Sequence, residues 1–140
     1  MSTTDVTDGA VASTHSSESG LDENVAGALS YLLGAITGVI FLVIEKENAF
    51  VRYHAAQSVV LSVAAFLVYV VLSVISTVIT AVLFAGGGSL LFGLLSLLMT
   101  LLWLAVTLVA FGAWIYLMFR AYRGETVRIP VLAGFADRIA

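Results

Sequence analysis

The sequence has no Asp, Glu, Lys or Arg from residue 53 to residue 119, although the whole chain is only 140 residues long. A helix in water needs a polar or charged face, and this stretch offers no charged one. Apolar segments of this length are typical of helices that cross the hydrocarbon core of a membrane. We therefore expect an all-α integral membrane protein with a single domain.

Cysteine is also absent, which excludes disulfide bonds, thiolate metal ligands and a cysteine nucleophile. No charged residue can lie at bilayer depth, and this disfavours a pump or a proton-coupled carrier, which usually needs a paired charge inside the membrane. An intramembrane protease needs two Asp, a Ser–His pair or a cluster of His, whereas these segments offer only His54. We therefore expect no enzymatic activity, no catalytic residue, no cofactor and no metal site.

The charges that are present are segregated along the chain. Residues 1–23 hold five acidic residues and no Lys or Arg. The basic residues lie in two short segments, as Lys46 and Arg52, and as Arg120, Arg123, Arg128 and Arg138. No long basic surface can form from this pattern, which argues against a nucleic-acid partner.

Apolar segments bounded by turns predict three transmembrane helices, over residues 24–44, 49–84 and 89–122. The first is about 31 Å long at 1.5 Å per residue, which matches one hydrocarbon core. The other two are over-long, at roughly 50 Å each, so they must tilt or project from the membrane. Glu45–Asn48 and Gly86–Gly88 separate the helices, and Asn48 can cap the second one.

The two ends of the chain have a different character. Residues 1–20 are rich in Ser, Thr, Asp and Gly, and predict a disordered tail outside the helical membrane domain of residues 21–140. Pro130 can open a short amphipathic helix over residues 130–139. We expect this last helix to lie in the membrane interface.

Three spans would place the Glu45–Asn48 turn and the C-terminal tail on the same side of the membrane. That side would then carry all six Lys and Arg residues, and the other side none. Cytoplasmic segments of membrane proteins carry an excess of Lys and Arg. We therefore expect a multi-pass protein of the plasma membrane, with its N-terminus outside and its C-terminus in the cytoplasm.

Each expected helix carries a stripe of small or hydroxyl-bearing residues at steps of three or four. Such stripes pack helices together in membranes, and the alternative is a polar groove for a substrate or for another helix. The stripes contain Gly34 and Gly38 on the first helix, Ser58, Ser62, Tyr69, Ser73, Ser76 and Thr80 on the second, and Ser96, Thr100 and Thr107 on the third. The expected partners are the lipid bilayer and other membrane helices, in a homo-oligomer or a hetero-complex.

His54 has two interpretations. It is either a structural hydrogen-bonding residue at a helix start, or a polar hub at the cytoplasmic mouth that changes charge near neutral pH.

The segment from Glu45 to Ser58 resembles a turn in a family of small prokaryotic membrane proteins that carries an uncharacterised-domain label. In that turn, charged residues precede Phe-Val, and His, Ala and Gln follow at similar spacing. The segment from Arg120 to Gly134 resembles the family's ending. The matching motif positions are Phe50, Arg52, His54, Gln57, Arg120, Arg123, Gly124 and Pro130. The family is grouped with the chloroplast inner-envelope import component, so the resemblance, over residues 21–140, implies a helical membrane protein related to a protein-import translocon.

These observations lead to the hypothesis of a non-enzymatic subunit or scaffold of a membrane complex, with protein translocation or insertion as its candidate process. The alternative is a small oligomeric channel or permeation pathway lined by the Ser/Thr stripes. A weaker alternative is a lipid-interacting protein that uses its C-terminal helix.

Overall fold

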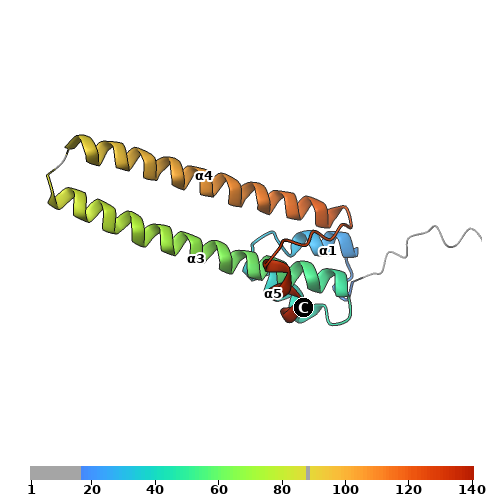
Figure 1. Ribbon diagram of the computed structural model, residues 1–140. Helices are drawn as coiled ribbons and strands as arrows, with labels where there is room; N and C mark the ends of the chain where they lie inside the picture. Colours follow the sequence, from blue (N-terminus) through green and yellow to red (C-terminus); the bar gives the residue numbers. More distant parts are fainter. Residues whose placement is uncertain (1–16, 88) are drawn as a thin grey trace, which may run out of the picture.

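The computed structural model describes residues 17–87 and 89–140, and this part of the chain is all-helical. Two long helices form a hairpin, and the short helices gather at one end of it (Figure 1). The helices are α1 (Glu23–Leu29), α2 (Ala35–Ile44), α3 (Ala49–Ala85), α4 (Ser89–Tyr122) and α5 (Leu132–Ile139). We call this end the base: it comprises α1, α2, α5, the first part of α3 and the last part of α4.

The two over-long helices are confirmed, and their bounds lie within one residue of the expected ones. α3 has 37 residues and α4 has 34, which correspond to about 55 Å and about 51 Å. Asn48 caps α3, because its side-chain Oδ1 accepts a hydrogen bond from Val51 N at 3.1 Å. Beyond the end of α4, Gly124 takes a φ of +75°, which favours glycine and turns the chain back.

The expectation of three spans is wrong, because the first one, over residues 24–44, does not form. This segment is broken into α1, with 7 residues, and α2, with 10 residues, and neither is long enough to cross a membrane. Gly34 takes a φ of +61° at the break, a conformation that glycine adopts readily. Among the described helices, α3 and α4 are the two that are long and apolar enough to span.

The α1–α2 segment enters the base and returns. At its start and end, Ser19 N donates a hydrogen bond of 2.9 Å to Glu45 Oε1. At its middle, Gly34 O accepts a hydrogen bond of 2.9 Å from Ser58 Oγ, further along α3. The two ends of the segment therefore lie together, at the end of the base that is farthest from the turn at Gly86. We call this the outer face of the base.

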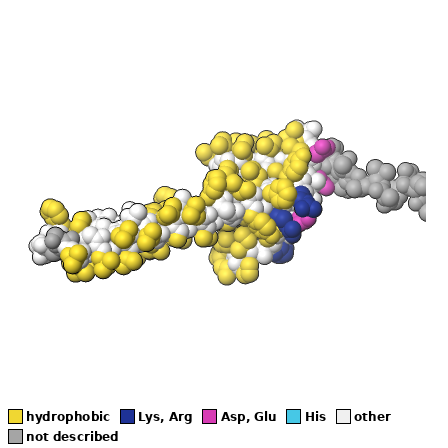
Figure 2. Space-filling model, turned by 90° about the horizontal axis from the view of Figure 1, so that it is seen from above, with side chains coloured by type: hydrophobic (Ala, Val, Ile, Leu, Met, Phe, Trp, Pro, Cys, Tyr) yellow, Lys and Arg dark blue, Asp and Glu magenta, His cyan; other side chains and the backbone are white. Residues whose placement is uncertain are grey.

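Two spanning helices change the expected arrangement of the termini. The turn before α1 and the end of α5 both lie at the base, where Arg52 Nε donates a hydrogen bond of 2.9 Å to Ala140 O. Three spans would place the two termini on opposite sides of the membrane, whereas two spans place them on the same side. Figure 2 shows charged side chains gathered at this end, while the outer part of the hairpin carries none on that face.

The terminal tail expected over residues 1–20 lies mostly outside the described residues. Residues 17–20 fall within the expected tail but form a turn, in which Ser17 Oγ donates to Leu21 O at 2.7 Å.

Gly38 allows α2 to pack closely on α3. A Cβ atom at this position would lie 2.8 Å from Ala55 O and 2.9 Å from Val59 Cγ2. The backbones of the two helices therefore approach within a distance that only glycine permits, as in other membrane helix pairs with small residues at the contact. The small residues of this segment make a contact within the chain.

We expect Gly38→Leu to lower the thermal unfolding midpoint of the protein in mild detergent, with a cost of about 1–3 kcal/mol for overpacking. Gly93→Leu is the matched control, because nothing lies within 4 Å of a Cβ at Gly93. Thermal unfolding followed by size-exclusion chromatography measures both. Equal midpoints for the two variants would contradict the close α2–α3 contact.

Candidate functional site

Three polar side chains meet inside the base. Tyr31 comes from the break between α1 and α2, and His54 and Gln57 come from one face of α3. All three are 0% exposed. We call them the polar cluster.

The hydrogen bonds of the polar cluster determine which atom donates and which accepts in each contact. Gln57 Nε2 donates to Val127 O at 2.8 Å, which fixes the orientation of its amide. Tyr31 Oη donates to Gln57 Oε1 at 2.6 Å, and its oxygen lies 3.0 Å from His54 Nδ1. Because the phenol has only one proton, His54 Nδ1 must be the donor in the last contact. In a neutral imidazole His54 Nε2 is then an acceptor, and it has no partner among the described residues.

The His54 ring is enclosed by aromatic side chains. Phe50 lies 4.5 Å away between ring centroids, and Tyr31 and Tyr53 each lie 5.8 Å away, all edge to face. Within residues 17–87 and 89–140, no carboxylate forms an ion pair with the imidazole. This environment fits a structural hydrogen-bonding residue, and the pH-sensing interpretation stays a prediction.

The polar cluster joins segments that are far apart in the sequence. Trp114 Nε1 of α4 donates to Tyr31 O at 2.6 Å, and Gln57 reaches the segment after α4 through Val127 O. In the described part of the chain, no group of three or more His, Asp or Glu could hold a metal ion. The cluster therefore acts through hydrogen bonds, which join the α1–α2 break to α3 and α4.

Glu45 forms a second polar contact at the outer face of the base. Its carboxylate is 0% exposed and accepts hydrogen bonds of 2.9 Å each from the backbone N–H groups of Glu18 and Ser19. Burial raises the pKa of Glu45, but these hydrogen bonds lower it by more, so its pKa lies below the ordinary value. Arg52 Nη1 donates to Leu42 O at 3.0 Å and to Glu45 O at 2.8 Å, which fixes the end of α2.

Part of the hydroxyl stripes lies between α3 and α4. Tyr69 Oη donates to Thr107 Oγ1 at 3.2 Å, and Trp103 Nε1 donates to Ser76 Oγ at 3.1 Å. Tyr69 and Trp103 also stack, with ring centroids 5.4 Å apart.

Other stripe residues donate hydrogen bonds to carbonyls of their own helix: Ser62 Oγ donates to Ser58 O, and Thr100 Oγ1 donates to Ser96 O. The exposed side chains of Ser73 and Thr80 make no hydrogen bond within the described residues.

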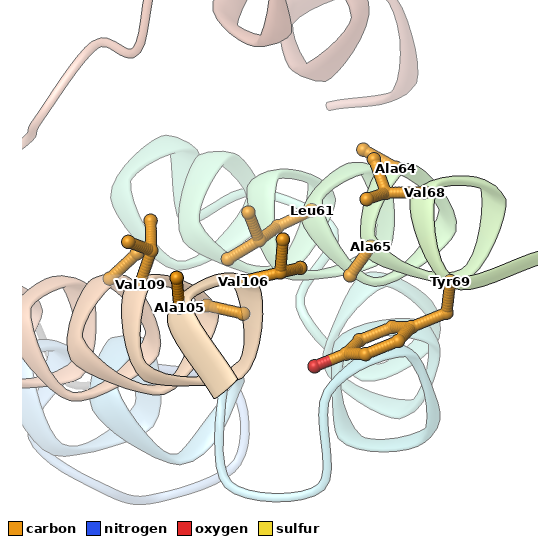
Figure 3. Close-up of a pocket in the computed structure, with 10 residues that line it drawn as sticks. Leu61, Ala64, Ala65, Val68, Tyr69, Ala105, Val106 and Val109 are labelled. Carbon is orange, nitrogen blue, oxygen red and sulfur yellow. The ribbon is translucent and has the colours of Figure 1, made fainter. Parts of the chain in front are cut away.

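Between these contacts and the base, α3 and α4 enclose a groove of about 410 Å³ (Figure 3). Its walls are almost entirely apolar: Leu61, Ala64, Ala65, Val68 and Tyr69 from α3, and Ala105, Val106, Val109, Ala110 and Ala113 from α4. The hydroxyl stripes are therefore interrupted by an apolar stretch at this depth.

The structure brings the motif positions together at the base. Phe50 packs on His54, and Arg120 forms an ion pair of 2.6 Å with Glu125. Arg123 lies 3.9 Å from the same carboxylate, Gly124 faces Asn24, and Pro130 stands just before α5. Sequence reasoning missed Tyr31 and the role of Glu45, because no spacing pattern connects either residue with its partners.

We expect Tyr31→Phe to destabilise the protein by about 1–3 kcal/mol, because it leaves the buried Gln57 Oε1 and His54 Nδ1 without partners. The control is Tyr116→Phe, since Tyr116 is 51% exposed and its hydroxyl makes no hydrogen bond in the described structure. Thermal unfolding in mild detergent compares them. A midpoint for Tyr31→Phe as high as that of the control would argue against the cluster as a structural centre.

Similar proteins are found among archaeal membrane proteins. The chain is 38% identical over 119 residues to a UPF0132 membrane protein of Methanocaldococcus jannaschii, covering 85% of this chain and 89% of that protein. It is 37% identical over 118 residues to a UPF0132 membrane protein of Archaeoglobus fulgidus, covering 84% and 95%. No solved structure matches the chain.

These relatives confirm a small prokaryotic membrane-protein family, whereas the link to the chloroplast import component stays a prediction. Residues 21–136 match the family described as the magnetosome magnetite crystal formation protein family. Together with the two long apolar helices, these matches show that the chain belongs to this family of membrane proteins.

Proposed function

We propose that this protein is a non-enzymatic subunit or scaffold of a membrane complex, and that its α3–α4 hairpin contacts the helices of a partner. One observation carries the proposal: among the described side chains of the hairpin, the buried ones lie only in the base, at residues 51 and 53–58 of α3 and at Leu117 and Ala121 of α4. The outer part of the hairpin thus offers its surface to lipid and to other helices.

The exposed hydroxyls of the hairpin support a helical partner over lipid alone. Ser73 and Thr80 lie on the outer part of α3, where hydrocarbon offers no hydrogen-bond partner. A hollow of about 450 Å³ near the end of α3 is also lined by Ser76, Thr77 and Thr80. Neighbouring helices in membranes commonly bond to such hydroxyls.

The orientation follows from the charges at the base. All six Lys and Arg residues lie in the helices of the base or in the segments that join them, so we place the charged end of the base at the cytoplasmic surface of the plasma membrane. With two spans, both termini would then lie in the cytoplasm. This replaces the expectation, based on three spans, that the N-terminus lies outside. A reporter fused within residues 1–20 should therefore be cytoplasmic.

Protein translocation or insertion is the process that we propose for this complex, and it rests on the resemblance of the motif positions alone. The alternative of an oligomeric channel requires a continuous polar path. The apolar groove between α3 and α4 does not favour such a path inside one chain.

Purification in mild detergent after cross-linking in the membrane tests the proposal. We expect partner proteins to co-purify with the wild-type chain, and their recovery to fall about fivefold in Ser73→Leu/Thr80→Leu, a change that corresponds to about 1 kcal/mol of interhelical hydrogen bonding. The control is Val78→Leu, an exposed apolar position on the same helix. A pure homo-oligomer that conducts ions, with a conductance altered by Ser73→Leu or Thr100→Leu, would instead establish the channel.

A further inference from the structure

A second apolar groove lies at the base, between α3 and α5. Its volume is about 330 Å³, and its lining includes Val60, Val63 and Leu67 of α3 and Leu132, Phe135 and Ile139 of α5. Its size lies at the lower end of the range for pockets that hold small ligands.

The groove exists because α5 touches α3 through small side chains. Ala133 and Ala136 of α5 are buried, and Ala136 packs with Tyr53 and Ala56 of α3. The larger Phe135 and Ile139 stay 52% and 45% exposed. The large apolar side chains of α5 therefore border a space that the chain itself does not fill.

The positively charged side chain of Arg138 lies next to Phe135, at the edge of this groove. The Arg138 guanidinium carbon lies 5.9 Å from the centre of the Phe135 ring. Arg138 is exposed and makes no ion pair with a described residue, whereas Arg128 pairs with Asp137 and Arg120 pairs with Glu125. Its charge is thus available to a ligand that occupies the groove.

We propose that the α3–α5 groove holds an acyl chain of an anionic phospholipid, whose phosphate is bound by Arg138. The groove opens beside a membrane-spanning helix, so acyl chains are the apolar ligands at hand. An amphipathic helix in the interface places its apolar face at the level of the acyl chains and its cations at the level of the headgroups. The guanidinium group binds phosphate oxygens in a bidentate manner, which suits this position.

Native mass spectrometry of the full chain in mild detergent tests the headgroup. Phosphatidylglycerol and phosphatidylcholine with identical acyl chains are added in turn, and we expect preferential retention of phosphatidylglycerol. Arg138→Gln should reduce this preference about fivefold, which corresponds to about 1 kcal/mol for one basic residue near anionic lipid. The control is Arg123→Gln, which removes an exposed arginine that lies just after α4 and near the Glu125 carboxylate, and it should leave the preference unchanged.

A second pair of variants tests the groove. Val63→Phe fills it and should reduce retention of both lipids, whereas Val74→Phe adds the same side chain at a similarly exposed position of α3 outside the groove. Inorganic phosphate should not displace the lipid. Equal retention of the two lipids by the wild type, an undiminished preference in Arg138→Gln, unchanged retention in Val63→Phe, or displacement by inorganic phosphate would each overturn the proposal.

Discussion

A helix that breaks in buried or apolar surroundings leaves backbone carbonyls without partners, so the protein itself must supply the donors. The break between α1 and α2 meets this requirement with side chains from three helices. Thr37 Oγ1 of α2 donates to Ser30 O at 2.9 Å, Trp114 Nε1 of α4 to Tyr31 O at 2.6 Å, and Ser58 Oγ of α3 to Gly34 O at 2.9 Å. Each donor also positions its own helix, so the assembly of the base depends on these bonds.

The same requirement divides the molecule into two parts. Of the described residues, the base holds most of the buried ones, the polar cluster and the charged side chains near it. Its α1–α2 segment exposes Leu33 and Ile36, at 63% and 65%, in the way that lipid contact requires. The outer hairpin is joined by a few contacts such as Tyr69 to Thr107. A fixed base with a free two-helix surface suits a protein that acts through contacts with other membrane helices.

The sequence predicted the long helices well, because an uncharged stretch, the Asn48 cap and the glycine turns are local signals. It predicted a first span wrongly, because residues 24–44 have the length and hydropathy of one. The donors that stabilise the break, Ser58 and Trp114, are distant in sequence, and no local pattern assigns them to it. The sequence predicted His54 as a polar residue at a helix start and Gln57 as a motif position, but their partner Tyr31 reaches them only because the segment is broken.

The central claim is that the α1–α2 segment does not cross the membrane, so that it begins and ends on the same side. The chain has no native cysteine, so single cysteines at Asp22, Lys46 and Gly86 can each be labelled with a membrane-impermeant maleimide in intact and permeabilised cells. The account predicts that Gly86→Cys reacts in intact cells, and that Asp22→Cys and Lys46→Cys react only after permeabilisation. Labelling of Asp22→Cys and Lys46→Cys from opposite sides would show that residues 24–44 cross the membrane, and would contradict it.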